Sequence, residues 1–309
     1  MFQNGAKTSC RRTSACTFPD GYSEADIYRS TMDGLMRTTF VLAVALTASA
    51  AAELRKDIEY AKPNGISQLL DVSIPEGKGP FPIAIIVHGG GWEAGDKAVE
   101  WVQPLFKPLN DAGFVWFSIN YRLSPQAPYP AMLEDVFAAV RWVKAHAAEY
   151  KGDPRRVALI GESAGGHLVA LVGTRGRGDA KVQAVVDFYG PHDFLARARE
   201  LDHGDYTGMA KRLWRTAPPP DVEQKLKEAS PINSVYKDMP PFLFIHGTAD
   251  KAVPVNQSPM MCDKMKAAGA SCEVILIEGA PHGMSNWEKN PAFQTYKPRM
   301  IDWLTKTLR

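Results

Sequence analysis

The sequence lacks several features that would assign the protein to a special class. It contains no run of 18 apolar residues, which excludes an ordinary transmembrane helix. Lys and Arg (36) nearly balance Asp and Glu (34), and no basic block is present, so nucleic acid is not indicated as a partner. Only 4 cysteines occur, and no His and Cys group has the spacing of metal ligands. We therefore expect no bound metal, no stable membrane anchor and no nucleic-acid partner.

Glycine-rich segments are present, but none has the pattern of a nucleotide-binding loop. Gly89-Gly90-Gly91 lacks the Lys-Ser/Thr ending of a P-loop. Gly176 and Gly178 follow a predicted helix, whereas the glycines of a dinucleotide-binding turn come before one. We expect that the protein works without a cofactor.

The amino-terminal segment is predicted to lie outside the folded domain. A signal peptide predicted over 36–52 begins with a short basic segment at Met36, continues with the apolar run 40–46, and ends in small residues. Residues 1–35 precede this complete signal and are polar and patternless, so we interpret them as an upstream extension from a mis-assigned start. The folded domain then occupies 53–309, and we expect a secreted or periplasmic protein.

Short apolar runs alternate with amphipathic segments through the rest of the chain. The predicted strands cover residues 67–74, 81–87, 114–120, 157–160, 182–189, 242–245 and 273–277. The predicted helices cover residues 131–148, 164–174, 257–268 and 293–307. This alternation predicts an α/β fold with a mostly parallel central sheet and helices on both faces.

One segment interrupts the alternation. Residues 190–240 separate two predicted strands and contain a single predicted helix, over 221–229. We expect this segment to form a small cap insertion over the site. Its aromatic residues either line a pocket or pack the cap onto the core: Phe194, Tyr206 and Trp214.

A G-x-S-x-G pentapeptide, Gly161–Gly165, lies between a predicted strand and a predicted helix. A serine at such a junction sits on a tight turn, which exposes its hydroxyl at the carboxyl edge of the sheet. The flanking glycines let the backbone pass close without Cβ clashes. The motif predicts Ser163 as a nucleophile, with the N–H of Ala164 as one donor to the oxyanion.

A nucleophilic serine also needs a base, an orienting acid and further oxyanion donors. His282 and Asp250 follow the strands predicted over 273–277 and 242–245, in the chain order Ser, Asp, His. The other histidines lie within strands, helices or irregular segments and have structural interpretations. Three consecutive glycines after the strand 81–87 make a loop with unobstructed N–H groups. We expect a catalytic triad of Ser163, His282 and Asp250.

Together these motifs resemble the α/β-hydrolase superfamily, and most closely its hormone-sensitive-lipase-like and bacterial feruloyl-esterase-like (BD-FAE) branch. The resemblance covers about 240 residues and includes the stretch from Asn120 to Trp142. Glu162 replaces the aspartate of the lipase-like proteins and favours the feruloyl-esterase-like side. The resemblance implies Gly90 and Gly91 as oxyanion donors, with the N–H of Trp92 as an alternative to one glycine.

The resemblance implies an α/β-hydrolase fold and a secreted serine carboxylic ester hydrolase. Its substrates would be short-chain or aryl esters, free or linked to polysaccharide, with acetylxylan and feruloyl esters among them. One alternative is an exopeptidase or amidase of the prolyl-peptidase type, which shares the triad order. Another is a non-catalytic binding protein of the same fold, which would require a broken triad. The sequence determines neither the natural ester nor the oligomeric state.

Two cysteines and two tryptophans add further expectations. Cys262, on the predicted helix 257–268, and Cys272, at the start of the next strand, can approach each other in a helix–loop–strand hairpin. A disulfide fits an exported protein, and two buried free thiols are the alternative. Trp92 and Trp287 flank the catalytic loops and are expected to contact substrate.

Overall fold

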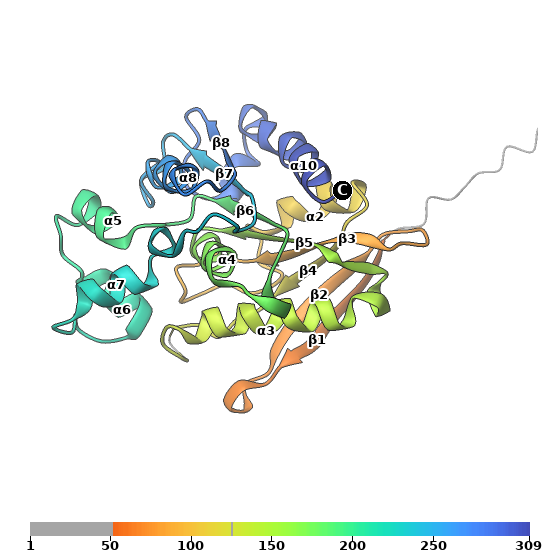
Figure 1. Ribbon diagram of the computed structural model, residues 1–309, viewed down its shortest axis with the longest axis horizontal. Coiled ribbons are helices and arrows are strands. Elements are labelled where there is room, and N and C mark those ends of the chain that lie inside the picture. Colours follow the sequence, from red (N-terminus) through yellow and green to blue (C-terminus); the bar gives the residue numbers. More distant parts are fainter. Residues whose placement is uncertain (1–51, 125) are drawn as a thin grey trace, which may run out of the picture. The chain divides into compact units, whose positions relative to one another are not determined.

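The computed structural model describes residues 52–124 and 126–309 (Figure 1). The upstream extension and the signal peptide as far as residue 51 fall outside these described residues. Eight strands form one sheet in the order β1-β2-β4-β3-β5-β6-β7-β8. The strands are β1 (Glu53–Ala61), β2 (Gln68–Ile74), β3 (Phe81–Val87), β4 (Val115–Ile119), β5 (Gly152–Glu162), β6 (Ala184–Phe188), β7 (Phe242–Gly247) and β8 (Cys272–Ile277).

The strand directions confirm the predicted mostly parallel sheet. Strand β2 pairs antiparallel with both β1 and β4, and the neighbours from β4 to β8 all run parallel. The helices of the described residues are α2 (Phe106–Asp111), α3 (Ala131–His146), α4 (Ala164–Arg175), α5 (Phe194–Leu201), α6 (Thr207–Trp214), α7 (Val222–Ala229), α8 (Gln257–Ala267), α9 (Met284–Trp287) and α10 (Tyr296–Thr307).

Strand β3 shows why the apolar runs in this sequence are nearly continuous. Ile83 and Ile85 belong to the core on one face of the sheet, and Ala84 and Ile86 to the core on the other face. Helices α3, α4 and α8 cover the first face, while α2 and α10 lie together on the opposite face (Figure 1). A strand covered by helices on both sides buries successive residues, so its sequence loses the alternation of a half-exposed strand.

The edge strand β1 was not predicted from the sequence. Its nine residues include Glu53, Arg55, Lys56, Asp57 and Glu59, and most of the strand is exposed. Charged side chains are common on edge strands, where they discourage pairing with other chains, and they hide the strand from an analysis based on apolar runs. This segment forms a strand because it pairs antiparallel with β2, and not because of an apolar pattern of its own.

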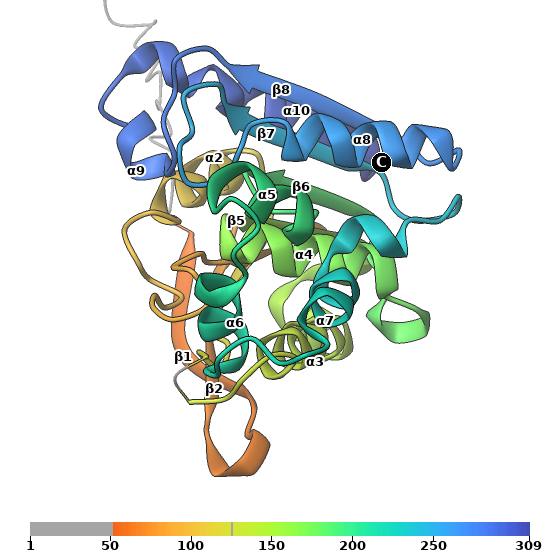
Figure 2. The same cartoon turned by 90° about the vertical axis from the view of Figure 1, so that its left-hand side faces the viewer.

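The segment 190–240 forms three short helices, α5, α6 and α7, of which only α7 was predicted. Figures 1 and 2 show them grouped on the side of the sheet where α4 begins. Helix α5 begins after Asp193, whose carboxylate accepts the N–H of Ala196 at 3.0 Å as an N-cap. A helix of eight residues has only about two turns, so its apolar positions recur only about twice along the sequence. Such a short pattern is not recognised reliably, and of these three helices only α7 was recognised.

Candidate active site

Ser163 lies on the turn between β5 and α4, at the junction predicted from the sequence. Its φ of 54° and ψ of −115° place the backbone outside the regions that serine ordinarily occupies. The N–H of Ser163 donates to the carbonyl of Phe188 at 2.8 Å, and this hydrogen bond holds the turn in place. A Cβ on Gly165 would overlap the carbonyl of Val87 in β3. The tight turn therefore depends on the small residues of the pentapeptide.

His282 lies in the loop between β8 and α9, with its Nε2 2.9 Å from Oγ of Ser163. The other ring nitrogen, Nδ1, lies 2.6 Å from Oδ2 of Asp250. A proton on Nδ1 satisfies the carboxylate and leaves Nε2 free to accept from the serine hydroxyl. The three side chains follow β5, β7 and β8, which are parallel and end at one edge of the sheet. The structure thus brings together the three residues predicted as a triad.

Asp250 occupies a buried site rich in hydrogen-bond donors. Its carboxylate accepts the N–H groups of Ala252 at 2.8 Å and Val253 at 2.9 Å. Burial alone would raise the pKa of Asp250, but hydrogen bonds from His246 and His282 outweigh it and hold the pKa well below its ordinary value. Asp250 is therefore ionised at neutral pH and can stabilise a positive charge on His282.

The loop after β3 supplies backbone donors next to the serine. Gly90 and Gly91 have φ values of +96° and +63°, and a Cβ on Gly90 would overlap the carbonyl of Ala94. Within the described part of the chain, no group accepts the N–H of Gly90, Gly91 or Ala164. The N–H of Trp92, the alternative donor, is also without an acceptor there. These donors are available to an oxyanion.

Glu162 connects the serine turn to this loop, a role that sequence reasoning missed. Its buried carboxylate accepts the N–H of Gly89, and a Cβ on Gly89 would overlap that carboxylate. Burial raises the pKa of Glu162 to about 7, although nearby His282 and the Gly89 N–H favour the charged form. Glu162 occupies the first variable position of the G-x-S-x-G motif, which does not predict its contact with Gly89. The two residues are 73 positions apart in the chain, so no local pattern connects them.

Four other histidines are buried, and three of them, His88, His167 and His246, make hydrogen bonds in structural positions. Nδ1 of His88 lies 2.8 Å from the carbonyl of Gly89, and burial lowers the pKa of His88 to about 4. Burial likewise lowers the pKa of His167 to about 3. His246 lies 2.8 Å from the hydroxyl of Ser258. These rings support the loops and are not positioned to act on Ser163.

A cavity of about 670 Å³ opens beside Ser163 and His282. Its walls come from the glycine loop after β3, from the cap helices α5 and α6, and from the loops that carry Asp250 and His282. The cap contributes both apolar and charged residues: Leu201, Met209, Arg197, Asp202 and Arg212. The cavity therefore has a mixed surface, without the continuous apolar lining that a long acyl chain would need.

The structure corrects the expectation for Trp287. This residue is fully buried, its indole N–H donates to the carbonyl of Pro281 at 2.6 Å, and it does not line the cavity. It supports the His282 loop from the core and is not placed to contact substrate. Trp92 does border the cavity but is only 4% exposed, and its indole N–H donates to Nδ1 of His167 at 3.2 Å.

The aromatic residues of the cap pack and do not line the cavity. Phe194 lies against Trp92 and His167, with ring centroids 5.8 and 4.8 Å away. Trp214 contacts Tyr129 edge-to-face. Of the two interpretations left open by the sequence, packing onto the core agrees with these contacts.

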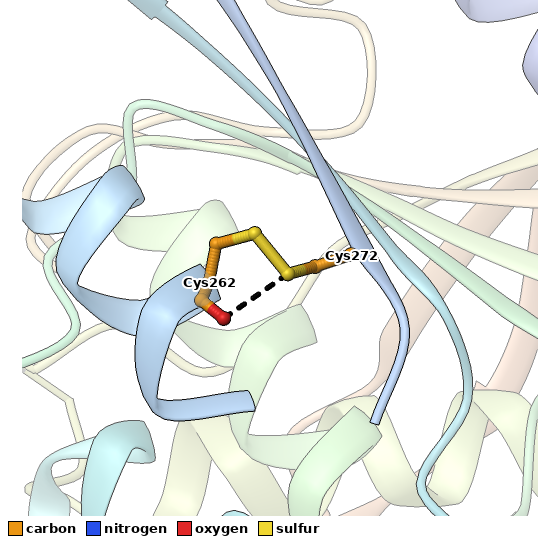
Figure 3. The surroundings of a disulfide bond; sticks show 2 residues. All are labelled: Cys262 and Cys272. Carbon is orange, nitrogen blue, oxygen red and sulfur yellow. Dashed lines mark hydrogen bonds between the residues drawn. A yellow bond between two sulfur atoms is a disulfide. The ribbon is translucent and has the colours of Figure 1, made fainter. Parts of the chain in front are cut away.

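Cys262 in α8 and Cys272 at the start of β8 are joined by a disulfide (Figure 3). The bond closes the helix–loop–strand hairpin that precedes the His282 loop. It lies away from the cavity, since neither cysteine is among the lining residues. Its expected effect is therefore on stability and not on the reaction.

In residues 52–124 and 126–309, no group of three or more His, Cys, Asp or Glu side chains could hold a metal ion. In the same part of the chain, no helix is both long and apolar enough to cross a membrane.

The fold agrees with the comparisons to known proteins. A family model described as BD-FAE matches residues 70–265, more than half of the chain. The chain therefore belongs to the BD-FAE family and has the α/β-hydrolase fold. This confirms the resemblance drawn from the sequence motifs.

Curated and solved relatives are named as esterases. Esterase LipC of Mycobacterium tuberculosis is 34% identical over 221 residues, which cover 66% of this chain and 53% of LipC. The chain spans about half the length of the curated relatives it matches first. A truncated carbohydrate esterase from gut microbiota superposes with a TM-score of 0.71 and 31% identity, covering 84% of this chain and 98% of that one.

The thermophilic esterase Est2 of Thermogutta terrifontis, solved with propionate bound, has a TM-score of 0.67 and 25% identity, covering 84% of this chain and 95% of that one. This chain therefore shares its α/β-hydrolase fold with proteins that are named as esterases.

Proposed function

We propose that this protein is an exported serine carboxylic ester hydrolase that acts on short-chain or aryl esters. The observation that carries the proposal is the hydrogen-bonded chain from Oγ of Ser163 through His282 to Asp250, at the wall of a cavity. The esterase relatives support the same reaction class. The natural ester is a small molecule or an ester linked to a polysaccharide, as the name of the carbohydrate esterase suggests.

In the proposed reaction, Oγ of Ser163 attacks the ester carbonyl carbon while Nε2 of His282 takes the hydroxyl proton. The charge that develops on the carbonyl oxygen is received by the N–H groups of Gly90, Gly91 and Ala164. The tetrahedral intermediate collapses, and the leaving alkoxide takes the proton from His282. Water then attacks the acyl-enzyme with the same proton transfers in sequence, which releases the acid and restores Ser163.

Asp250 orients the imidazole throughout this sequence. Its Oδ2 holds Nδ1 of His282, which keeps Nε2 directed at Oγ of Ser163. Its depressed pKa keeps it ionised while His282 carries the transferred proton, so the imidazolium is stabilised in the step where charge separates.

Labelling with a fluorophosphonate probe tests the proposal directly. We expect the wild-type protein to be labelled at Ser163, and the Ser163→Ala variant to remain unlabelled. A panel of p-nitrophenyl esters, acetylated xylan, methyl ferulate and aminoacyl anilides then defines the substrate. Absence of labelling and of turnover would favour a non-catalytic binding protein, whereas faster cleavage of anilides than of any ester would indicate a peptidase or amidase.

A further inference from the structure

Basic side chains gather at the cavity, although the chain as a whole is nearly neutral. Arg197 of α5, Arg212 of α6 and Lys251 of the loop after β7 all line it. The lining also includes two carboxylates, Asp202 and Glu162. Asp202 already pairs with Arg197, and Glu162 is buried beneath the glycine loop. The positive charge of the other basic groups is therefore not balanced by acidic residues of the wall.

Arg197 is fixed in the wall by its own contacts. Its Nη1 donates to Asp202 at 3.3 Å and its Nη2 to the carbonyl of Ala252 at 3.1 Å, and the side chain is 20% exposed. Burial lowers the pKa of Arg197, Asp202 opposes this effect, and the charge of Arg212 lowers it further. Both guanidinium groups belong to residues that line the same cavity.

Arg212 differs from Arg197 because its guanidinium has no partner within the described residues. Of the nearby carboxylates, Asp202 pairs with Arg197 and Glu93 pairs with Arg215. Within the described residues, Arg212 forms no salt bridge and its guanidinium donates no hydrogen bond. Its Nη1 would lie 2.8 Å from a Cβ placed on Gly91. The charged group therefore sits directly against the glycine loop whose N–H groups face the reacting carbonyl in the proposed function.

Arg212 is exposed and lines the cavity, so its guanidinium donors are open to a ligand. Such a guanidinium can exchange water for a planar anion held by two hydrogen bonds. A bound anion would also oppose the effect of the Arg212 charge on the pKa of Arg197. We propose that Arg212, supported by Arg197, binds a carboxylate carried by the ester substrate, within a few bonds of the ester that is cleaved. This inference rests on the proposed function and adds a substrate class, namely acidic esters.

The carboxylate can belong to either side of the ester, and two matched pairs of substrates distinguish them. For the acyl side, mono(4-nitrophenyl) fumarate is compared with 4-nitrophenyl (E)-4-methylpent-2-enoate, in which an isopropyl group replaces the carboxylate. The trans double bond prevents the carboxylate from attacking its own ester. For the alcohol side, 4-acetoxybenzoate is compared with 4-isopropylphenyl acetate. In each pair the ratio of kcat/KM, charged over neutral, is measured.

We expect the Arg212→Gln variant to lower this ratio about tenfold for at least one pair, because the variant loses the charge-assisted hydrogen bonds. A tenfold change corresponds to about 1.4 kcal/mol. Arg212→Lys should restore part of the ratio, because it keeps the charge but not the planar fork. Lys211→Gln is the matched control. Lys211 is exposed on the same helix and does not line the cavity. The Lys211→Gln variant loses the same charge as Arg212→Gln, so its ratio of kcat/KM should stay within about twofold of the wild-type ratio.

The outcomes separate the two proposals. If the wild-type protein cleaves both neutral esters but Arg212→Gln leaves both ratios as they are, the acidic-ester inference is overturned while the esterase function stands. The inference also fails if Lys211→Gln lowers the ratios as much as Arg212→Gln, because the effect is then one of general surface charge. If no ester is cleaved and Ser163 is not labelled, the esterase function itself is wrong.

Discussion

The carboxylate of Glu162 accepts the N–H of Gly89, which ties the residue before Ser163 to the first glycine of the loop after β3. The two parts of the proposed site, nucleophile and oxyanion donors, are therefore held together by one buried hydrogen bond. No side chain larger than that of glycine fits at position 89 without displacing Glu162. A buried acid in this place also makes the stability of the protein depend on pH.

Replacing Glu162 by Gln should remove part of that pH dependence. In the folded protein burial raises the pKa of Glu162 from 4.5 to about 7, so the fold retains a proton that the unfolded chain has lost. The stabilisation is complete below about pH 4.5 and is lost as the pH rises through about 7, a change of up to about 3 kcal/mol. Urea unfolding at pH 4.5 and pH 8 checks this for wild type and Glu162→Gln. An equal pH dependence of the two proteins would contradict it.

Removing either member of the Ser163–His282 pair should lower turnover by several orders of magnitude. The remaining rate enhancement over water should be about 10³–10⁴, from the oxyanion donors and binding. Because the pair acts as a unit, the Ser163→Ala/His282→Ala double variant should be little worse than either single variant. Steady-state kinetics on p-nitrophenyl acetate measures this, with circular dichroism as the control for folding. Near-full activity in Ser163→Ala would refute the assignment.

Activity should decline with acyl-chain length. The cavity of about 670 Å³ has arginines and an aspartate in its wall, so a long chain would have to displace water from charged groups without gaining apolar contact. We expect kcat/KM to fall from acetyl and butyryl to palmitoyl p-nitrophenyl esters. A maximum at twelve or more carbons would show that an apolar channel opens in solution.

Loss of the disulfide should reduce stability without reducing the intrinsic rate. Cys262 and Cys272 are 10 residues apart, and a loop of this size gives at most about 3 kcal/mol in the chain-entropy model. The Cys262→Ser/Cys272→Ser double variant should lower the free energy of unfolding by up to that amount and retain wild-type kcat. Non-reducing peptide mapping of the exported protein provides the control. Recovery of both cysteines as free thiols would argue against the bond.

The exported protein should begin near the end of the predicted signal peptide. Cleavage after Ala50 or Ala52 leaves Ala51 or Glu53 as the first residue, and both sites have small residues at the positions that signal peptidase reads. Amino-terminal sequencing of protein collected outside the cytoplasm tests this. Retention of Met1 would rule out both the signal and the mis-assigned start.

The sequence alone was sufficient for strands β2 to β8 of the sheet, but not for the edge strand β1, and for the three residues of the predicted triad. Strands such as β3 and β7 are recognisable because they are covered on both faces, so their apolar runs are continuous. Ser163 is recognisable because a tight turn between strand and helix demands glycines at fixed positions. His282 and Asp250 could be placed because parallel strands bring the loops at their carboxyl ends to one edge.

Other features were decided only by tertiary structure. Glu162 meets Gly89, and Arg212 meets Gly91, through contacts between distant parts of the chain that no local pattern encodes. Trp287 flanks a catalytic loop in sequence, yet it is buried in the core, because proximity along the chain does not determine which side of a loop a side chain occupies. The sequence determined which groups are available for chemistry. Long-range packing decided which of these groups face the cavity. It also decided their charge, because burial and hydrogen bonds shift the pKa values of groups such as Glu162 and Asp250.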